Sequence, residues 1–230
     1  MPGRARELLT LAKALAVGGQ RRQDAVAIIT KPENLFQPYT TTSANRYPDE
    51  LASVAAALAT DAPAILSFGC STGEELLSLR DAFPGAHITG VDINPLAVRA
   101  ARKRVAADPR MTVVRGGEAP AGEFDVVLAL AVFRHAALND APTSCAGVIS
   151  FADYERTLTG LSDCLRPGGL LVLRHANFRF GDTAVAAAYE VVSTGYASAG
   201  EGGLPTPLYD RDDRLIGTEP RDDGVYRKGS

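Results

Sequence analysis

The sequence predicts an α/β fold in which a doubly wound, mostly parallel sheet carries an antiparallel hairpin near its C-terminal end. Two observations lead to this fold class. Short apolar runs alternate with segments of helical periodicity between residues 64 and 174, which is the pattern of strand–helix–strand units in parallel sheets. Beyond that alternation, Leu208–Ile216 indicates a hairpin that turns at Asp212 and Asp213.

Five strands and three helices account for the alternation. The expected strands are Ala64–Phe68, His87–Val91, Met111–Val114, Phe124–Val132 and Gly169–Arg174. The expected helices are Gly73–Phe83, Pro95–Ala107 and Phe151–Leu165. Pro95 suits the first turn of a helix, where an amide hydrogen has no partner to lose. The nearly continuous apolar run at 124–132 predicts a strand that is buried on both faces.

The first sixty residues are expected to add helices and a lid-like loop to the main domain, which spans residues 61–230. Arg4–Val17 places several leucines on one helical face and predicts an amphipathic helix. Thr30–Asp49 is polar and rich in proline, which predicts a loop. Glu50–Thr60 is rich in alanine and predicts a second helix.

The C-terminal fifty residues depart from the alternation. Thr183–Ser193 is compatible with a helix, and Ser198–Pro207 is rich in glycine and proline, which predicts a surface loop. Val225–Lys228 is expected to be a last edge strand. Residues 136–150 form an insertion after the fourth strand, where we expect part of the pocket for a second substrate.

Composition limits the class of partner. The chain has 230 residues and a net charge of −3, without the basic excess typical of nucleic-acid binding. Its three cysteines show no paired spacing, which favours a reducing, cytoplasmic compartment over a disulfide framework or a zinc site. No apolar run approaches the roughly 18 residues of a membrane span. We expect a small-molecule partner, no nucleic acid and no membrane; a homodimer is compatible with the sequence.

The strongest local signal is a small-residue turn between the first strand and the following helix. Gly69, Cys70, Ser71 and Gly73 form this turn. Glycine allows unusual backbone angles and lets a ligand approach closely. The helix that follows presents its amide groups and the positive end of its dipole at the same place. The turn therefore predicts a binding site for a nucleotide-like cofactor.

An acidic residue ends the second strand and strengthens this prediction. Asp92 stands where a carboxylate accepts hydrogen bonds from ribose hydroxyls, and Ile93 follows it. The third glycine of a nicotinamide-binding loop is absent, because Glu74 occupies its position. A carboxylate there would lie near a pyrophosphate, which argues against a nicotinamide cofactor.

These motifs resemble the class I, Rossmann-like methyltransferases that use S-adenosylmethionine (SAM). Gly69–Gly73 is similar to their glycine loop, with Ser71 in place of the middle glycine. Gly117–Ala119 resembles the segment that holds adenine, and 124–127 and 165–169 resemble the fourth strand and the turn before the fifth. The resemblance implies SAM as cofactor and S-adenosyl-L-homocysteine (SAH) as product. The cofactor-binding residues it implies are Gly69, Cys70, Ser71, Gly73, Asp92, Ile93, Glu118, Ala119 and Ala129.

Two histidines follow neighbouring strands of the expected sheet. His135 follows the fourth strand and His175 the fifth, so both should approach the site from the carboxyl ends of strands. Histidine is the usual base near neutral pH, so we expect His135 to deprotonate an acceptor hydroxyl, with His175 as a second catalytic residue. Asn177 would orient the acceptor. The alternative is that both histidines cap strand ends through hydrogen bonds to the backbone.

The remaining candidates are weaker. Tyr39 and Arg46 lie in the polar N-terminal loop, which would either close over the cofactor and contact the substrate or form an ordinary surface connection. Cys70 is best explained by the need for a small residue. The aspartates at 210, 212 and 213 are typical of a solvated turn, so no metal site is predicted there, although the sequence would not expose a magnesium shared with a substrate.

The expected function is transfer of the SAM methyl group to a hydroxyl of a small molecule, with a sugar or another polyhydroxy metabolite favoured. Two alternatives stay open within SAM binding. One is N-methylation of a small molecule, although the chain lacks the Asn/Asp-Pro-Pro-aromatic run found in many such enzymes. The other is a module that binds SAM without catalysis. A nicotinamide oxidoreductase is the rival from a different cofactor class.

Overall fold

The computed structural model describes residues 13, 19–30, 35–39, 42–195 and 205–229. The helix expected at Arg4–Val17 and most of the loop expected at Ser198–Pro207 lie outside these residues. A helix that the sequence did not predict, α2 at Gly19–Thr30, precedes the polar loop. Among the helices within these ranges, none combines the length and apolarity needed to cross a membrane.

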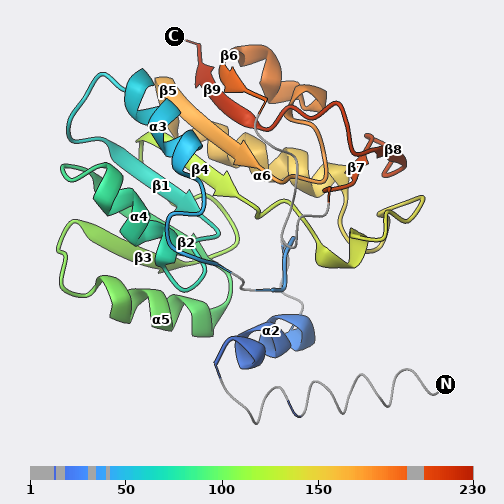
Figure 1. Cartoon of the computed structure of the whole chain (residues 1–230), viewed down its shortest axis with the longest axis horizontal. Coiled ribbons are helices and arrows are strands. Elements are labelled where there is room, and N and C mark those ends of the chain that lie inside the picture. The colour runs from blue at the N-terminus through green and yellow to red at the C-terminus, as the bar shows by residue number, and fades with distance from the viewer. Residues whose placement is uncertain (1–12, 14–18, 31–34, 40–41, 196–204, 230) are drawn as a thin grey trace.

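A seven-stranded sheet forms the centre of the protein, in the order β3-β2-β1-β4-β5-β9-β6 (Figure 1). The first five strands in this order are parallel, and β9 runs antiparallel to both of its neighbours, β5 and β6. Their bounds are β1 Ala64–Phe68, β2 His87–Asp92, β3 Met111–Arg115, β4 Phe124–Leu130, β5 Leu165–Arg174, β6 Tyr189–Thr194 and β9 Gly224–Lys228. The doubly wound α/β prediction is confirmed. The strand order reverses between β1 and β4, so a crevice opens at their carboxyl ends.

Helices cover both faces of the sheet. On one face lie α3 (Pro48–Ala57), α4 (Glu74–Ala82) and α5 (Pro95–Val105). On the other lies α6 (Phe151–Asp163), seen behind the strands in Figure 1. Because each face packs against helices, β4 is buried along nearly its whole length, as its apolar sequence predicted.

Capping residues fix where two of these helices begin. The side-chain oxygen of Asn94 accepts hydrogen bonds from the amides of Leu96 and Ala97 at the start of α5, with Pro95 in the first turn. Ser150 caps α6 in the same way by accepting from the amide of Asp153. Asn94 follows β2, and Ser150 ends the insertion after β4. Each cap therefore fixes the point at which the chain turns from a connecting segment into a helix.

The N-terminal segment is anchored across the carboxyl edge of the sheet. Phe36 is buried, and its ring meets the ring of Phe133 edge-on at 5.0 Å between centroids. Further along the segment, the amide of Asn45 donates to the hydroxyl of Ser78 on α4, at 2.8 Å. Figure 1 shows α2 and residues 35–39 on the side to which the parallel strands point. The segment therefore passes over the crevice between β1 and β4.

The predicted C-terminal hairpin is present as a small separate sheet of β7 (Leu208–Tyr209) and β8 (Leu215–Gly217). It holds the insertion after β4: the amide of Leu215 donates to the carbonyl of Thr143, and the amide of Cys145 donates to that of Asp213. The Asp213 carboxylate also accepts from the amide of Phe151 at the start of α6. The backbone and side chain of Asp213 therefore hold the insertion and the start of α6 in place.

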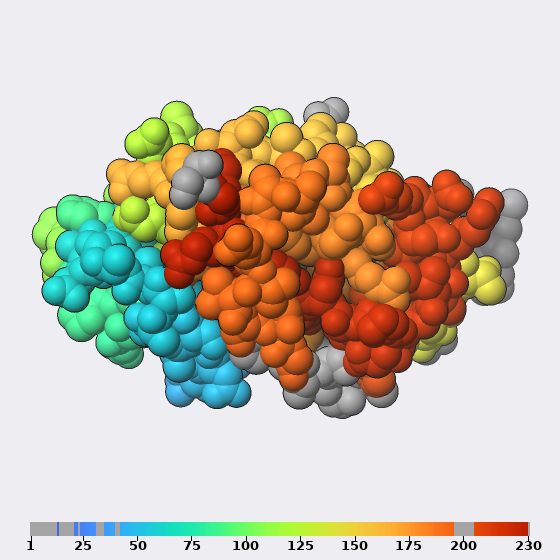
Figure 2. Space-filling model, turned by 90° about the horizontal axis from the view of Figure 1, so that it is seen from above, coloured from blue at the N-terminus to red at the C-terminus, as the bar shows by residue number. Residues whose placement is uncertain are grey.

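Two expectations for the C-terminal region are wrong. Thr183–Ser193 is not an α-helix: a short 3-10 helix, η3 at Ala184–Ala188, leads into β6. The β-branched Val191 and Val192 favour a strand once β9 is available as a partner. Val225–Lys228 does form a strand but not the edge, because β9 lies between β5 and β6. Figure 2 shows the true edge, β6, at the molecular surface beside α3.

A buried charge network joins the end of β5 to α3 and β9. Arg174, which is 7% exposed, pairs with Glu50 of α3 and with Asp223 just before β9. The Asp223 carboxylate also accepts from Arg221 and from the amide of His175. Buried charges are stable only when paired, so this network fixes the relative positions of three separate elements.

Replacing Asp223 should strongly destabilise the fold. Asp223→Asn leaves Arg174 and Arg221 buried with less compensating charge, and breaking such a network costs about 3–5 kcal/mol. Urea unfolding followed by circular dichroism measures the change. The control is Glu190→Gln on the exposed edge of the same sheet, which should change the free energy of unfolding by less than about 0.5 kcal/mol. Equal midpoints for the two variants would contradict the assignment.

Candidate active site

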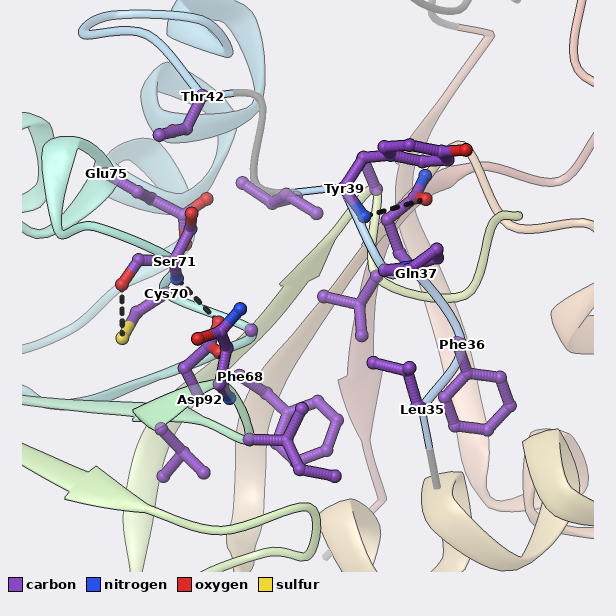
Figure 3. A pocket seen from close by; sticks show the side chains of 18 of the residues that line it. Leu35, Phe36, Gln37, Tyr39, Thr42, Phe68, Cys70, Ser71, Glu75 and Asp92 are labelled. Carbon is purple, nitrogen blue, oxygen red and sulfur yellow. Dashed lines mark hydrogen bonds between the residues drawn. The ribbon is translucent and has the colours of Figure 1, made fainter. Parts of the chain in front are cut away.

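An open pocket of about 1120 Å³, including its solvent-filled mouth, lies at the carboxyl ends of β1, β2 and β4. One wall is the glycine turn after β1, together with Asp92 and the first turn of α4. The opposite wall is built by the N-terminal segment, whose Leu35, Gln37 and Tyr39 are seen in Figure 3. The pocket therefore occupies the crevice that the strand order creates, and the segment that we expected to be lid-like lines it.

The glycine turn owes its shape to two left-handed glycines and one left-handed serine. Gly69 has φ +80°, and a Cβ there would lie 2.3 Å from Cγ2 of Val132, so a larger residue would be strained and would have to displace Val132. Gly73 has φ +90° and begins α4 as its N-cap, away from the pocket lining. Ser71 has φ 50°, and its amide donates to Asp92 at 2.8 Å, which stabilises this uncommon conformation.

Asp92 lies in the pocket with both carboxylate oxygens used by the backbone. Oδ2 accepts from the amide of Ser71 and Oδ1 from that of Asn94, each at 2.8 Å. Burial raises the pKa of Asp92, and these two hydrogen bonds partly oppose the shift. A carboxylate has about four lone-pair positions, so each oxygen can accept a further hydrogen bond from a diol. Asp92, Ile93, Cys70 and Ser71 all line the pocket where the sequence predicted a cofactor.

A second, shallower pocket adjoins the first along β3. It is lined by Glu118 and Ala119 and shares Val91, Gly116 and Gly117 with the main pocket. This adjoining space is where the predicted adenine-binding residues lie. Ala129 is different: it is fully buried inside β4 and lines neither pocket, so the expectation that it contacts the cofactor is wrong. The neighbouring Leu130, Ala131 and Val132 line the pocket instead.

The expected position of the Glu74 carboxylate near a bound cofactor is wrong. Glu74 turns away from the pocket, pairs with Arg104 of α5 at 2.8 Å, and accepts from the hydroxyl of Thr72. Its neighbour Glu75 lines the pocket in its place. The sequence did not indicate which of the two glutamates faces the pocket. It did indicate that they point in different directions, because adjacent residues on a helix do not share a face.

Glu75 is a carboxylate enclosed by the pocket wall. Its Oε1 accepts from the hydroxyl of Ser67 at 2.7 Å, and its remaining accessible surface faces the pocket that it lines. Burial raises the pKa of Glu75 to about 7, and the Ser67 hydrogen bond and the charge of Arg46 only partly oppose this. An acidic group in this environment favours a positively charged ligand over a phosphate.

Removing the Glu75 charge should stabilise the ligand-free protein at alkaline pH. Folding raises the pKa of Glu75 from the usual 4.5 to about 7. Below pH 4.5 the group is protonated in both the folded and the unfolded state and costs no stability. As the pH rises from 4.5 toward 7, the unfolded state ionises first, so the free energy of unfolding falls. Above pH 7, Glu75→Gln should therefore be more stable than the wild type by up to about 3 kcal/mol, with no difference below pH 4.5. Urea unfolding across this pH range measures it.

The neighbouring glutamate provides a control of opposite sign. Glu74→Gln loses a partly exposed ion pair with Arg104 and should lower stability by at most about 1 kcal/mol. If Glu75→Gln destabilised the protein at pH 8 as Glu74→Gln does, the Glu75 carboxylate would not be the buried, weakly compensated charge described above.

His135 lies after β4, but its geometry corrects the expected role as a general base. Its Nδ1 accepts a hydrogen bond from the amide of Ala137, which caps the short 3-10 helix η1 at Ala136–Leu138. Burial lowers the pKa of His135, so the ring is neutral at pH 7 and its single proton lies on Nε2. With one nitrogen engaged and the other protonated, this imidazole has no free lone pair for a substrate proton. The capping alternative fits the structure.

His175 and Asn177 also lie outside the pocket lining. His175 is buried against the ring of Tyr47, and burial, followed by the charge of Arg174, lowers its pKa to about 3, which makes it a weak base. Asn177 is fully buried: its Oδ1 accepts from the amide of His135, and its Nδ2 donates to the carbonyl of Pro207. The catalytic expectation for His175 and the substrate-binding expectation for Asn177 are thus replaced by structural roles.

Two substitutions at residue 135 separate capping from proton transfer. Asn caps a turn with its side-chain oxygen but does not titrate, so His135→Asn should retain most of the activity and stability. His135→Ala removes the cap and should cost about 1 kcal/mol. Turnover and melting temperature measure the two effects. Loss of turnover in His135→Asn, with unchanged melting temperature, would restore the general-base assignment.

Residues 66–171, which run from β1 into β5, match the family described as "Methyltransferase domain". A curated relative, demethylmenaquinone methyltransferase of Thermus thermophilus, is 38% identical over 109 residues, which are 47% of this chain and 45% of the relative. The present chain thus spans less than half of that relative's length. The match supports the predicted methyltransferase domain in the segment that carries the glycine turn and Asp92.

Solved structures resemble about half of the chain. A SAM-bound amino pentose methyltransferase from Micromonospora echinaspora is 28% identical and covers 54% of this chain and 48% of its own, with a TM-score of 0.39. Mitomycin 7-O-methyltransferase is 23% identical and covers 54% of this chain and 34% of its own, with a TM-score of 0.40.

The described residues hold no cluster of three or more histidine, cysteine, aspartate or glutamate side chains arranged to hold a metal ion. The carboxylates of Asp210 and Asp213 accept turn and capping hydrogen bonds, and that of Asp212 pairs with Arg214. The pocket carboxylates Asp92 and Glu75 are likewise engaged by amide and hydroxyl donors.

Proposed function

We propose that the chain is a SAM-dependent methyltransferase that acts on a small molecule. The observation that carries this proposal is the pocket itself. It joins a glycine turn, a carboxylate suited to a ribose diol and a second carboxylate suited to a cation, at the point where the strand order reverses. The match of residues 66–171 to a methyltransferase domain supports the same activity.

The residues present fit the cofactor group by group. Asp92 would accept from the ribose hydroxyls, and the slot beside Glu118 and Ala119 would hold the adenine. The close passage at Gly69 would let the sulfonium region lie against the backbone. When bound, SAM supplies an activated methyl group. The protein's own contribution is to hold the acceptor atom in line with that group and to exclude water.

The wall opposite Asp92 has a large apolar and aromatic part. Leu35, Phe36, Pro38 and Tyr39 of the N-terminal segment and Val132 after β4 contribute it, beside the polar Gln37, Thr42 and Ser43. Such a wall favours an acceptor with a flat apolar or aromatic face over the sugar that the sequence first suggested. The demethylmenaquinone named as the substrate of the Thermus relative is an acceptor of this chemical kind.

Among the described residues, no histidine lines the pocket. An acceptor with a phenol-like hydroxyl is compatible with such a lining. Phenols ionise near pH 10, far more easily than alkyl alcohols, so transfer to them depends more on positioning than on a strong base. Tyr39 would contact the ring of the acceptor, because its own ring reaches the same wall. Transfer to nitrogen or carbon of a similar ring would use the same pocket.

Isothermal titration calorimetry with SAH tests the cofactor. We expect the wild type to bind SAH and not NAD, and Asp92→Asn to bind SAH about 10-fold to 100-fold more weakly, because a hydrogen bond to a charged group is lost. Thermal melting of the ligand-free variants controls for the contact of Asp92 with Ser71. Heat from NAD but not from SAH would overturn the proposal.

Labelled SAM incubated with apolar and polar small-molecule fractions of a cell extract tests the acceptor. We expect the label in the apolar fraction and a large loss of transfer in Tyr39→Ala. Label in the polar fraction would favour the sugar-like acceptor. Binding of SAM without transfer to any fraction would favour the non-catalytic module.

A further inference from the structure

A side-chain amide, that of Gln37, lies within the mainly apolar part of the wall that the N-terminal segment builds. Pro38 follows it, and a residue before proline is held in an extended backbone conformation. Phe36 and Pro38 are buried and anchor the segment, whereas Gln37 is half-buried and Tyr39 is 44% exposed. The anchored chain therefore leaves Gln37 and Tyr39 accessible in the pocket that both of them line.

The backbone fixes the orientation of the Gln37 amide. Its Oε1 accepts a hydrogen bond from the amide of Tyr39 at 3.4 Å. Because a backbone amide only donates, this contact identifies the oxygen end of the side chain and leaves Nε2 on the other end. Among the described residues, no group accepts a hydrogen bond from Nε2. The wall thus presents a donor whose two hydrogens are available to a ligand.

Gln37 stands apart from the polar groups that would hold the cofactor. Figure 3 shows it across the pocket from Ser71 and Asp92, and shows Thr42 on the same side as Glu75. The side chains around Gln37 in its own segment are the apolar and aromatic ones of the wall. A ligand that meets the Gln37 amide is therefore the second substrate and not the cofactor.

We propose that Gln37 recognises the methyl acceptor by donating a hydrogen bond from Nε2 to an oxygen on the acceptor ring. The substrate class is then an aromatic ring that carries a carbonyl or hydroxyl oxygen and lies against the ring of Tyr39. This assignment rests on the proposed function and deepens it. The sequence suggested Tyr39 for substrate binding but did not suggest Gln37.

A donor at this place selects between classes of acceptor. A protonated amine brings only donors, so it and Nε2 would both lack a partner. A hydrocarbon ring would withdraw Nε2 from water without replacing the lost hydrogen bond, which costs free energy. A ring oxygen substituent satisfies the donor. Whether the methyl group goes to that oxygen or to a neighbouring carbon, the hydrogen bond fixes the rotation of the ring in its own plane.

Two probes that differ by one oxygen test the assignment. 1-Tetralone carries a carbonyl that only accepts hydrogen bonds, and tetralin is the same ring system without it. In titration calorimetry at pH 8 with protein saturated with SAH, Gln37→Leu should weaken 1-tetralone binding about 5-fold to 10-fold and change tetralin binding by less than about twofold. Gln37→Glu keeps the shape but cannot donate, so it should weaken 1-tetralone binding at least as much.

Thr112→Val, a polar-to-apolar change on the exposed edge strand β3, lines neither pocket and is the control; it should alter neither affinity. Unchanged SAH binding shows that each variant is folded. The assignment is overturned if both Gln37 variants bind 1-tetralone like the wild type, if Gln37→Leu weakens both probes equally, or if the wild type binds SAH but neither probe. In these cases SAM binding itself stands. If the wild type does not bind SAH, the proposed function fails, and this assignment fails with it.

Discussion

The hydrogen bond from the Ser71 amide to the Asp92 carboxylate is the interaction on which the rest of the site depends. It joins the turn after β1 to the end of β2 and holds Ser71 in a left-handed conformation that a serine rarely adopts unaided. The adjacent amides of Gly69 and Cys70 both donate to the carbonyl of Val91 in β2. The turn is therefore shaped before any ligand arrives, and the carboxylate that fixes it also faces the pocket.

The second constraint is the coverage of the crevice by the N-terminal segment. Phe36 inserts into the aromatic cluster around Phe133, and Tyr47 packs on His175, so both ends of the described segment are anchored in the body of the domain. Between these anchors the segment supplies the apolar wall and Arg46. Asn177, which follows β5, supports this arrangement. It accepts a hydrogen bond from the amide of His135 after β4 and donates one to the carbonyl of Pro207, so it joins the loops that contain these residues.

The regular part of the fold could be predicted from the sequence because its signals are local. Alternating apolar runs and glycine or proline at turns gave the five parallel strands and the crevice that contains Asp92. What failed depended on long-range partners. Val191 and Val192 are compatible with helix or strand until β9 supplies hydrogen bonds, and Glu74 and Glu75 differ only in which side of α4 meets Arg104. His135 was misassigned because a capping amide cannot be seen in a residue pattern.

The charges of the pocket decide between cofactor classes more firmly than its glycines do. Two carboxylates, Asp92 and Glu75, line a partly desolvated space to which Arg46 brings one opposing charge. A pyrophosphate would add negative charge beside both, and the electrostatic cost rises as water is excluded. A sulfonium ligand with an ammonium group brings positive charge to the same space. The glycine turn is common to both ligand classes, so selectivity must come from the acidic residues around it.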